Sequence, residues 1–496
     1  MVVALVAQDV FADSRTDIKI AAPWEVSGPD PATNGYIFLR MGVMETLVDA
    51  DSSGALVAAL ASAWSTSEDG LIWHFSLQKA KFHDGTSLDA EAAAAALSRA
   101  RSKPGPLAKA PIAAIGVEGE RLRITLTSPF AALPSVLAHS STGILAPASF
   151  DATGKAIAAI GTGPFKVREL APPQTLHTVR FAEYWGTPAR LSSANYLATK
   201  RAETRALMAE SGDADLVFTL DPSGYQRLSQ LDNVTGVAVA IPRVMVIKTN
   251  AGHDALKTPK ARLALSLAID RVGIAAGITR FPESAATQLF PPALGEWHDQ
   301  SLAPLGYDPA TAKRLLKELG WRPGADGILT RNGARFSLTL RTFPDRPEQP
   351  LVAAALQDQW RAIGVELKVS VANYSEIPAG HQDGSLELAL FARNYGLTPD
   401  PIGTVQADYS SGGGDWGAMN WNAPAISAAL AKIAATADKS VRQPLIKQVA
   451  ETLQAELPLI PVVWYQHTAS AARGLKGVVI DPLERSYGLH KVSWSH

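Results

Sequence analysis

Helix-like and strand-like segments alternate through the second half of this chain, and this alternation constrains the fold more than any other feature. One helix signal opens at Asp308-Pro309, where the aspartate can cap the helix and the proline suits its first turn. Helical, strand, helical and strand patterns follow one another at 306–321, 334–343, 349–365 and 366–374. Strands separated by helices of this length pair side by side in βα units, so the chain is predicted to be an α/β protein.

The N-terminal half has shorter strand signals and tighter turns. Residues 71–78 alternate between apolar and polar side chains between two Asp-Gly turns, which predicts a half-buried strand. Residues 89–102 predict a helix, and residues 45–70 predict the end of a helix, a turn and a short helix. In the middle of the chain, 257–277 predicts one long amphipathic helix.

Three chemically versatile side chains, Trp73, His74 and His83, lie close together in this N-terminal region. His74 falls on the outward face of the predicted strand, and His83 falls in a turn. Neither has a partner at the spacing of metal ligands, such as His-x-x-x-His on a helix. We therefore interpret this cluster as scaffold rather than as a catalytic patch.

Composition limits the classes of protein that remain. The chain has 496 residues, 47% of them hydrophobic, which is enough for two or three domains with large cores. Its formal net charge is −1 and it has no lysine- or arginine-rich run, which argues against nucleic acid and anionic membranes as partners. It contains no cysteine, so disulfides, thiolate metal sites and cysteine nucleophiles are excluded.

The N-terminus suggests export. Residues 1–12 hold a short apolar stretch, and Val10 and Ala12 suit the cleavage site of a signal peptidase. We interpret 1–12 as a signal-peptide remnant, with the mature chain beginning near Asp13. The alternative is an ordinary N-terminus or first strand, because the basic residues of a complete signal are missing.

Several longer motifs occur together and in order. They are "LASAWSTSEDGLIWHFSLQKAKFHDGTSLDAEAAAAALSR", "IGTGPFKV", "YDPATAKRLLKELGW" and "LQDQWRAIGVELKV". Together they resemble family 5 of the extracytoplasmic solute-binding proteins, the peptide, nickel and opine binders of ABC importers. The resemblance extends from about residue 16 to about 470, and in several places the nickel-type subgroup is the most similar.

The resemblance implies a type II periplasmic binding protein, cluster C-like, with two lobes around a deep cleft and an extra subdomain in lobe I. The implied division is 13–243 for lobe I, 247–465 for lobe II and 466–496 for a return to lobe I. The implied hinge strands are "VMVIKTN" and "LIPVVWYQ". Ligand binding would close the cleft, and the membrane permease would read that closure.

The loop "NYGLTPDP" bears on the ligand. Peptide binders of this family carry an aspartate there that holds the α-amine of the peptide, and Leu397 takes its place here. A leucine cannot pair with an ammonium group, so ordinary dipeptides are disfavoured. The arginine and the histidine with which the nickel subgroup holds its chelate and metal are also missing, from 139–150 and from 404–424.

The remaining candidates for ligand contact are aromatic and polar groups near the implied cleft. Two tryptophans beside polar side chains in the loop 408–422 suit stacking on a polar organic ligand, and Arg40 is placed to clamp a carboxylate. A structural loop, an ordinary helix and a structural arginine at Arg393 are the alternatives. The predicted ligand-binding residues are Trp24, Tyr36, Arg40, Arg393, Tyr395, Trp416, Asn420 and Trp421.

These observations predict a substrate-binding protein of an ABC importer and not an enzyme. We expect a monomer outside the cytoplasm, periplasmic or membrane-associated, with permease subunits as partners, no nucleic acid, and no cofactor or metal of its own. The expected ligand is a small polar molecule with carboxylates: an opine-like compound, a metal chelate or a modified peptide. The alternatives are an oligopeptide- or dipeptide-binding protein of the same family and a carboxylate-dependent hydrolase, although no catalytic motif points to the latter.

Overall fold

A mixed sheet of ten strands forms the centre of the protein. The structure is a computed structural model and describes residues 15–344 and 346–495. The predicted signal remnant at 1–12 lies outside the described residues. The strand order is β17 (Glu366–Val371), β16 (Ser337–Thr342), β18 (Leu388–Asn394), β12 (Val234–Thr249), β19 (Leu459–Ala472), β11 (Leu216–Phe218), β1 (Asp17–Ala22), β10 (Ser193–Ala198), β9 (Thr175–Arg180) and β8 (Phe165–Ala171).

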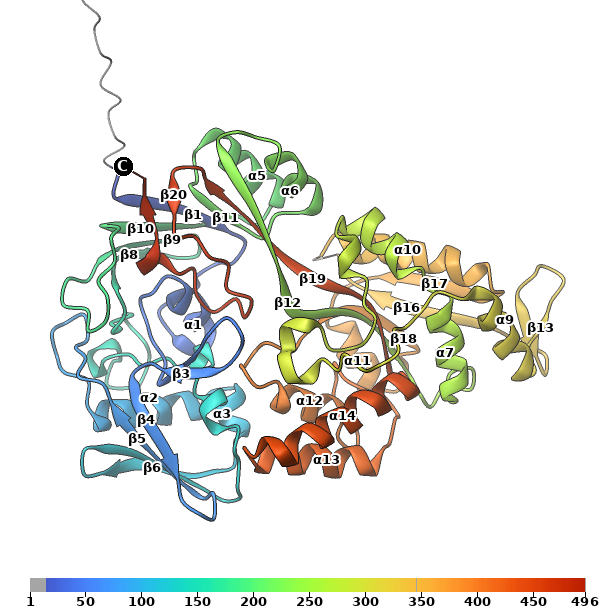
Figure 1. The fold of residues 1–496 in the computed structure, drawn as a ribbon, viewed down its shortest axis with the longest axis horizontal. Coiled ribbons are helices and arrows are strands. Elements are labelled where there is room, and N and C mark those ends of the chain that lie inside the picture. Colours follow the sequence, from blue (N-terminus) through green and yellow to red (C-terminus); the bar gives the residue numbers. More distant parts are fainter. Residues whose placement is uncertain (1–14, 345, 496) are drawn as a thin grey trace, which may run out of the picture.

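Two long strands, β12 and β19, join the two halves of this sheet. They pair antiparallel from Val234 opposite Ala472 to Lys248 opposite Leu459, and they run side by side from one half of the molecule to the other (Figure 1). The pairing shifts between Ala240 and Val244, where Pro242 has no N–H to donate to the ladder. The predicted hinge segments, 244–250 and 459–466, lie in or at the end of these strands.

The buried apolar side chains form separate cores on the two sides of the crossing strands. One pair of clusters gathers side chains mainly between Val244 and Val463, and the others gather the N-terminal part of the chain together with its C-terminal segment. For example, Trp494 packs in the same core as Ile18, and its Nε1 donates to the carbonyl of Asp17 at 2.8 Å. This arrangement confirms the predicted α/β fold with two lobes.

We keep the predicted boundaries as our proposal for the lobes. Lobe I is 13–243 with the return segment 466–496, and lobe II is 247–465. Besides the crossing strands, contacts between described residues of the two lobes include two hydrogen bonds: the N–H of Asp400 donates to Oγ of Ser135 at 2.7 Å, and the N–H of Ala131 donates to the carbonyl of Ala434 at 2.9 Å. The rings of Tyr225 and Phe281 also meet across the lobes, with centroids 5.5 Å apart.

Helices cover the sheet in both lobes, and lobe I has a second sheet. That sheet has the order β4 (Ala61–Thr66), β5 (Ile72–Leu77), β7 (Arg121–Leu126) and β6 (Ile112–Glu118). The main helices of lobe I are α1 (Pro31–Arg40), α2 (Ala90–Arg101), α5 (Ala202–Ser211) and α6 (Pro222–Leu228). Those of lobe II are α7 (Pro259–Leu267), α9 (Pro309–Glu318), α10 (Glu348–Arg361), α11 (Glu376–Gln382), α12 (Ile402–Tyr409), α13 (Pro424–Ala435) and α14 (Lys439–Glu456).

Two predicted helices are wrong. The segment 257–277 divides into α7, α8 (Arg271–Ile274) and a π-helical turn, because the carboxylate of Asp270 accepts from the N–H of Gly273 at 2.8 Å and starts a new helix there. The short helix expected within 45–70 is replaced by strands, including β4, whose register against β5 buries Trp73 and Phe75. The alanines of this segment suit a helix locally, but pairing with β5 decides its structure.

The motif "IGTGPFKV" owes its glycines to close backbone contact. A Cβ on Gly161 would lie 2.0 Å from the carbonyl oxygen of Val43, and one on Gly163 would lie 2.2 Å from that of Gly42. A backbone neighbour cannot turn aside as a flexible side chain does. The glycines therefore let the chain before β8 pack directly against the segment that follows α1.

Replacing Gly163 with alanine should destabilise the fold. We expect Gly163→Ala to lower the free energy of unfolding by about 1–3 kcal/mol, since the added methyl forces the backbone apart. Urea denaturation measures the difference. Gly116→Ala is the matched control, because a Cβ there meets nothing within 4 Å, and its change should stay within about 0.5 kcal/mol. Equal effects of the two substitutions would contradict this explanation.

Candidate ligand-binding cavity

A cavity of about 830 Å³ lies where the two lobes meet the crossing strands. Residues 463–468 of β19, with Ile241 and Arg243 of β12, form one wall. Lobe I contributes residues from the segment after β1, from α1 and from the start of α5, while lobe II contributes residues from 343–348 and from 394–397. A cavity of this size suits a small organic molecule.

Cationic side chains dominate the charges around the cavity. Among the described residues that line it, seven are lysine or arginine and three are acidic. The cations are Arg40, Lys200, Arg201, Arg205, Arg243, Arg346 and Arg485, and the anions are Asp221, Glu348 and Glu484. A concave surface with this excess of positive charge attracts anionic ligands.

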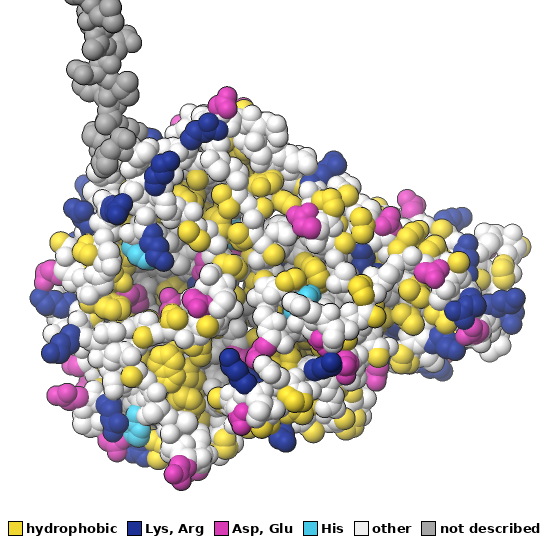
Figure 2. Space-filling view, in the orientation of Figure 1, with side chains coloured by type: hydrophobic (Ala, Val, Ile, Leu, Met, Phe, Trp, Pro, Cys, Tyr) yellow, Lys and Arg dark blue, Asp and Glu magenta, His cyan; other side chains and the backbone are white. Residues whose placement is uncertain are grey.

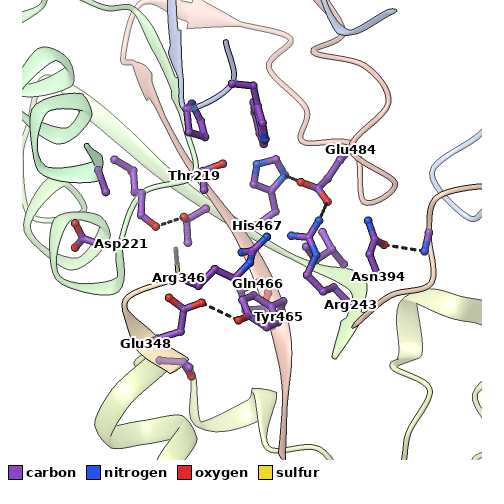
Figure 3. A pocket seen from close by; sticks show the side chains of 18 of the residues that line it. Thr219, Asp221, Arg243, Arg346, Glu348, Asn394, Tyr465, Gln466, His467 and Glu484 are labelled. Atoms are coloured by element: carbon purple, nitrogen blue, oxygen red, sulfur yellow. Dashed lines mark hydrogen bonds and ion pairs between the residues drawn. The ribbon is translucent and has the colours of Figure 1, made fainter. Parts of the chain in front are cut away.

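Glu484 is the centre of a buried ion cluster in the cavity wall. Its Oε2 accepts from Nη2 of Arg243 at 2.6 Å, and its backbone carbonyl accepts from Nε of Arg40 at 2.7 Å. Figure 3 shows Glu484 between Arg243 and His467. Burial alone would raise the pKa of this carboxyl, but the surrounding cationic groups, Arg243 first, lower it to about 2. Glu484 is therefore ionised at neutral pH.

The other cations differ in how far they are already engaged. Arg205 donates to backbone carbonyls only, including that of Phe218 at 3.0 Å, and Arg485 pairs with Asp49. Arg346 is different: its guanidinium lies 5.3 Å from the ring centre of Tyr465, and it makes no ion pair with any described residue. Arg346 is half-buried and free to pair with a ligand.

Three of the predicted ligand-binding residues, Trp24, Tyr36 and Arg40, line this cavity. The guanidinium carbon of Arg40 lies 4.0 Å from the ring centre of Trp24 and 5.5 Å from that of Tyr36. Contact of these three residues with a ligand stays a prediction. Their common position follows from the structure, since α1 and the segment after β1 both end at the cavity.

Arg393 and Tyr395 do not line the cavity. Nε and Nη2 of Arg393 donate to the two carboxylate oxygens of Asp408 at 2.6 and 2.7 Å. Tyr395 is fully buried, and its hydroxyl lies 2.9 Å from that of Tyr409. Both side chains are engaged within lobe II. The surroundings of Arg393 are those of a structural arginine, which was the alternative to ligand contact.

The predicted loop residues Trp416, Asn420 and Trp421 also lie away from the cavity. Trp416 packs edge-on against Phe391 in a core of lobe II. The side-chain amide of Asn420 donates to Asn250 at 2.8 Å, and Nε1 of Trp421 donates to a carboxylate on α14. The loop is held within lobe II, and we do not carry these residues into the proposed site.

Sequence reasoning missed the residues that contribute most to the cavity, among them Arg243, Arg346, His467 and Glu484. His467 lies in β19 between two other polar residues, Gln466 and Thr468, and Glu484, which is buried beside it, comes from the C-terminal return segment. The change from apolar to polar side chains at 466–468, within the strand "LIPVVWYQHTASAA", was the available signal. It became informative only when the tertiary structure placed it at the cavity.

The structure gives two further findings about the described residues. Nowhere in 15–344 or 346–495 do three His, Asp or Glu side chains gather as a set of metal ligands. None of the helices in these ranges has the length and apolar character needed to cross a membrane.

Comparisons with known proteins agree with one another over most of the chain. A family profile described as "Bacterial extracellular solute-binding proteins, family 5 Middle" matches residues 55–416. The glutathione-binding protein GsiB of Salmonella typhimurium is 28% identical over 505 residues, which cover 97% of this chain and 93% of that protein.

Solved structures show the same fold. NikA from Brucella suis in complex with Fe(III)-EDTA has a TM-score of 0.88 at 24% identity, and the match covers 96% of this chain and 100% of that one. AgaA from A.tumefacien R10 in complex with agropinic acid has a TM-score of 0.77 at 20% identity, with coverage of 97% and 99%. The likeness to these two structures concerns the fold alone.

The matches confirm the prediction that this is a solute-binding protein and not an enzyme, and members of the family bind small ligands and work with ABC permeases. The chain belongs to family 5 of the bacterial extracellular solute-binding proteins.

Proposed function

We propose that this protein captures a small, polar organic ligand with carboxylate groups and delivers it to the permease of an ABC importer. The observation that carries the proposal is the excess of cationic over acidic side chains around a cavity between two lobes. A cation that is partly removed from water and has no counter-ion is unfavourable, and a ligand carboxylate supplies the missing charge. Arg346 is the clearest case, because it is free of ion pairs with the described residues.

The names of the relatives support this ligand class. GsiB is a glutathione-binding protein, AgaA is in complex with agropinic acid, and NikA is in complex with Fe(III)-EDTA. All three compounds are small and carry carboxylates. They represent the three kinds of ligand expected here: a modified peptide, an opine-like compound and a metal chelate.

The acidic residues of the cavity suit a ligand that also carries an amino group. Oε1 of Glu348 accepts from the hydroxyl of Tyr465 at 2.7 Å (Figure 3), and Asp221 lines the cavity near the start of α6. Either carboxylate offers an ammonium group a partner, which Leu397 cannot do. Glutathione, with two carboxylates and one amino group, is therefore the first compound to test.

We further propose that the protein acts as a monomer outside the cytoplasm and without nucleic acid as a partner. The family description, extracellular, supports the location. Figure 2 shows positive and negative side chains interspersed over the visible face, without one large basic patch. Such a surface gives a polyanion no continuous track of phosphate contacts.

Calorimetric titration tests the ligand class and the role of Arg346 together. We expect glutathione, agropinic acid or Fe(III)-EDTA to bind, and free Ni²⁺ and dialanine not to bind. Arg346→Gln should weaken that binding about tenfold, or ~1.4 kcal/mol, because it removes a charge-assisted contact.

Arg314→Gln is the matched control for this substitution. Arg314 lies on the exposed face of α9 and pairs with Glu318 at 2.9 Å, away from the cavity, so its loss should leave affinity unchanged. Tight binding of dialanine, or of Ni²⁺ alone, would contradict the proposed ligand class. Unchanged affinity in Arg346→Gln would remove Arg346 from the site.

The protein should close when its ligand binds. A ligand that touches residues of both lobes favours the arrangement in which the lobes are close. Small-angle X-ray scattering should therefore show a smaller radius of gyration with the bound compound than without it. A compound that gives no calorimetric signal serves as control, and an unchanged radius at saturation would show that the lobes do not rotate.

A further inference from the structure

Buried polar atoms without partners gather on one wall of the cavity, where α1, β11 and β19 meet. They are Nη1 of Arg40, Oγ1 of Thr219 and both ring nitrogens of His467. Of the buried, unpartnered side-chain atoms among the described residues, these are the ones that belong to cavity-lining residues. Buried polar groups in folded proteins are nearly always hydrogen-bonded, so a cluster of exceptions among residues that line a cavity indicates a missing partner.

Within the described part of the chain, the ring nitrogens of His467 make no hydrogen bond. The side chain is 5% exposed, with the rings of Trp24 and Phe218 at centroid distances of 6.5 and 5.7 Å. Nδ1 lies 3.9 Å from Oε1 of Glu484, which is too long for a hydrogen bond. Burial lowers the pKa of the imidazole to about 4, so at neutral pH it has one N–H to donate.

Arg40 is fixed in place and still has a donor to spare. Nε donates to the carbonyl of Glu484, and the guanidinium stacks on Trp24. Nη2 lies 4.0 Å from Oε1 of Glu484, and the buried hydroxyl of Tyr487 lies beside the guanidinium, but Nη1 makes no hydrogen bond with a described residue. The side chain of Arg40 is only 9% exposed, so water cannot solvate it freely.

The charges of this wall do not balance. Arg40 and Arg243 contribute two positive charges, Glu484 contributes one negative charge, and His467 is neutral. One positive charge is left uncompensated in a buried environment, which costs free energy unless a counter-charge arrives. A single ligand carboxylate would neutralise it.

We infer that Arg40, Thr219 and His467 form a subsite for one carboxylate of the ligand. One carboxylate oxygen accepts from Nη1 of Arg40 and the other from the N–H of His467, with the hydroxyl of Thr219 beside them. Glu484 keeps its hydrogen bonds to Arg243 and Arg40 and so fixes the position of the Arg40 guanidinium. The inference rests on the proposed function and goes beyond it, because it places one ligand group on lobe I and makes His467 a residue that selects for a carboxylate.

The first test needs no ligand. In ligand-free protein, His467→Leu should raise the melting temperature, because it removes a buried polar group that has no partner. The matched control is His83→Leu, since His83 is also largely buried but both of its ring nitrogens are hydrogen-bonded. Nδ1 accepts from the N–H of Gly161 at 3.2 Å, and Nε2 donates to the carbonyl of Gly163 at 3.0 Å. That control should lower the melting temperature.

The second test compares glutathione with glutathione diethyl ester, whose carboxylates are masked. The wild type should bind glutathione at least tenfold more tightly than the ester. His467→Leu should lose most of this preference, and His83→Leu should keep it. Isothermal titration calorimetry on the full chain measures all six affinities.

Either of two results would overturn the subsite. One is a lower melting temperature for His467→Leu, which would make the imidazole an ordinary part of the core. The other is an undiminished preference for glutathione in His467→Leu. If the wild type bound none of the carboxylates while His467→Leu raised the melting temperature, the proposed ligand class would fail and the stability result would still support an unfilled polar subsite.

Discussion

The pairing of β12 with β19 is the constraint on which the rest of the structure depends. Both halves of the ten-stranded sheet attach to these two strands, so the lobes can change their angle only if the strands twist or bend. The ladder is irregular near Pro242, where an N–H is missing and the register shifts. The cavity lies at this same place. The proposed ligand binding and the proposed lobe motion would therefore act on one short stretch of backbone.

The ion cluster around Glu484 adds chemistry to that frame. Glu484 comes from the C-terminal return segment and has a positive φ of 56°. Its turn is fixed because the carboxylate of Asp481 accepts from the N–H groups of Leu483, Arg485 and Ser486. Through its bonds to Arg243 on a crossing strand and to Arg40 on α1, this turn brings distant parts of the chain to the cavity wall. A strained residue held by its surroundings is common at functional sites.

Most of the fold was predictable because its signals are local and repeated. Asp308 caps α9 as expected, accepting from the N–H of Thr311 at 2.9 Å, and Asp89 caps α2 in the same way. The prediction of one helix over 257–277 was wrong because an aspartate inside an apolar helical pattern can either face solvent or start a new helix. The residues around it do not show which of these happens.

The site was less predictable, because the chemistry of an arginine or a histidine depends on its partners. Arg393 and Arg40 are the same residue type, yet Asp408 neutralises the first with a bidentate pair and the second keeps a free donor. Pairing of this kind joins residues whose contact no periodicity predicts. In the sequence, His467 is likewise only one position in a strand. The structure shows that aromatic rings surround it and that its ring nitrogens make no hydrogen bond with the described residues.

Leu397 shows how the two lobes divide the task of recognition. It lines the cavity and is 45% exposed, while two hydrogen bonds nearby hold its loop: the N–H of Asp400 donates to Ser135 of lobe I, and the carboxylate accepts from Arg442 at 2.7 Å. The loop that presents Leu397 to a ligand thus also joins the lobes. A leucine offers non-directional apolar contact, so in the proposed function Leu397 would add shape, and charge selection would fall to the cations around the cavity, including Arg346 of lobe II.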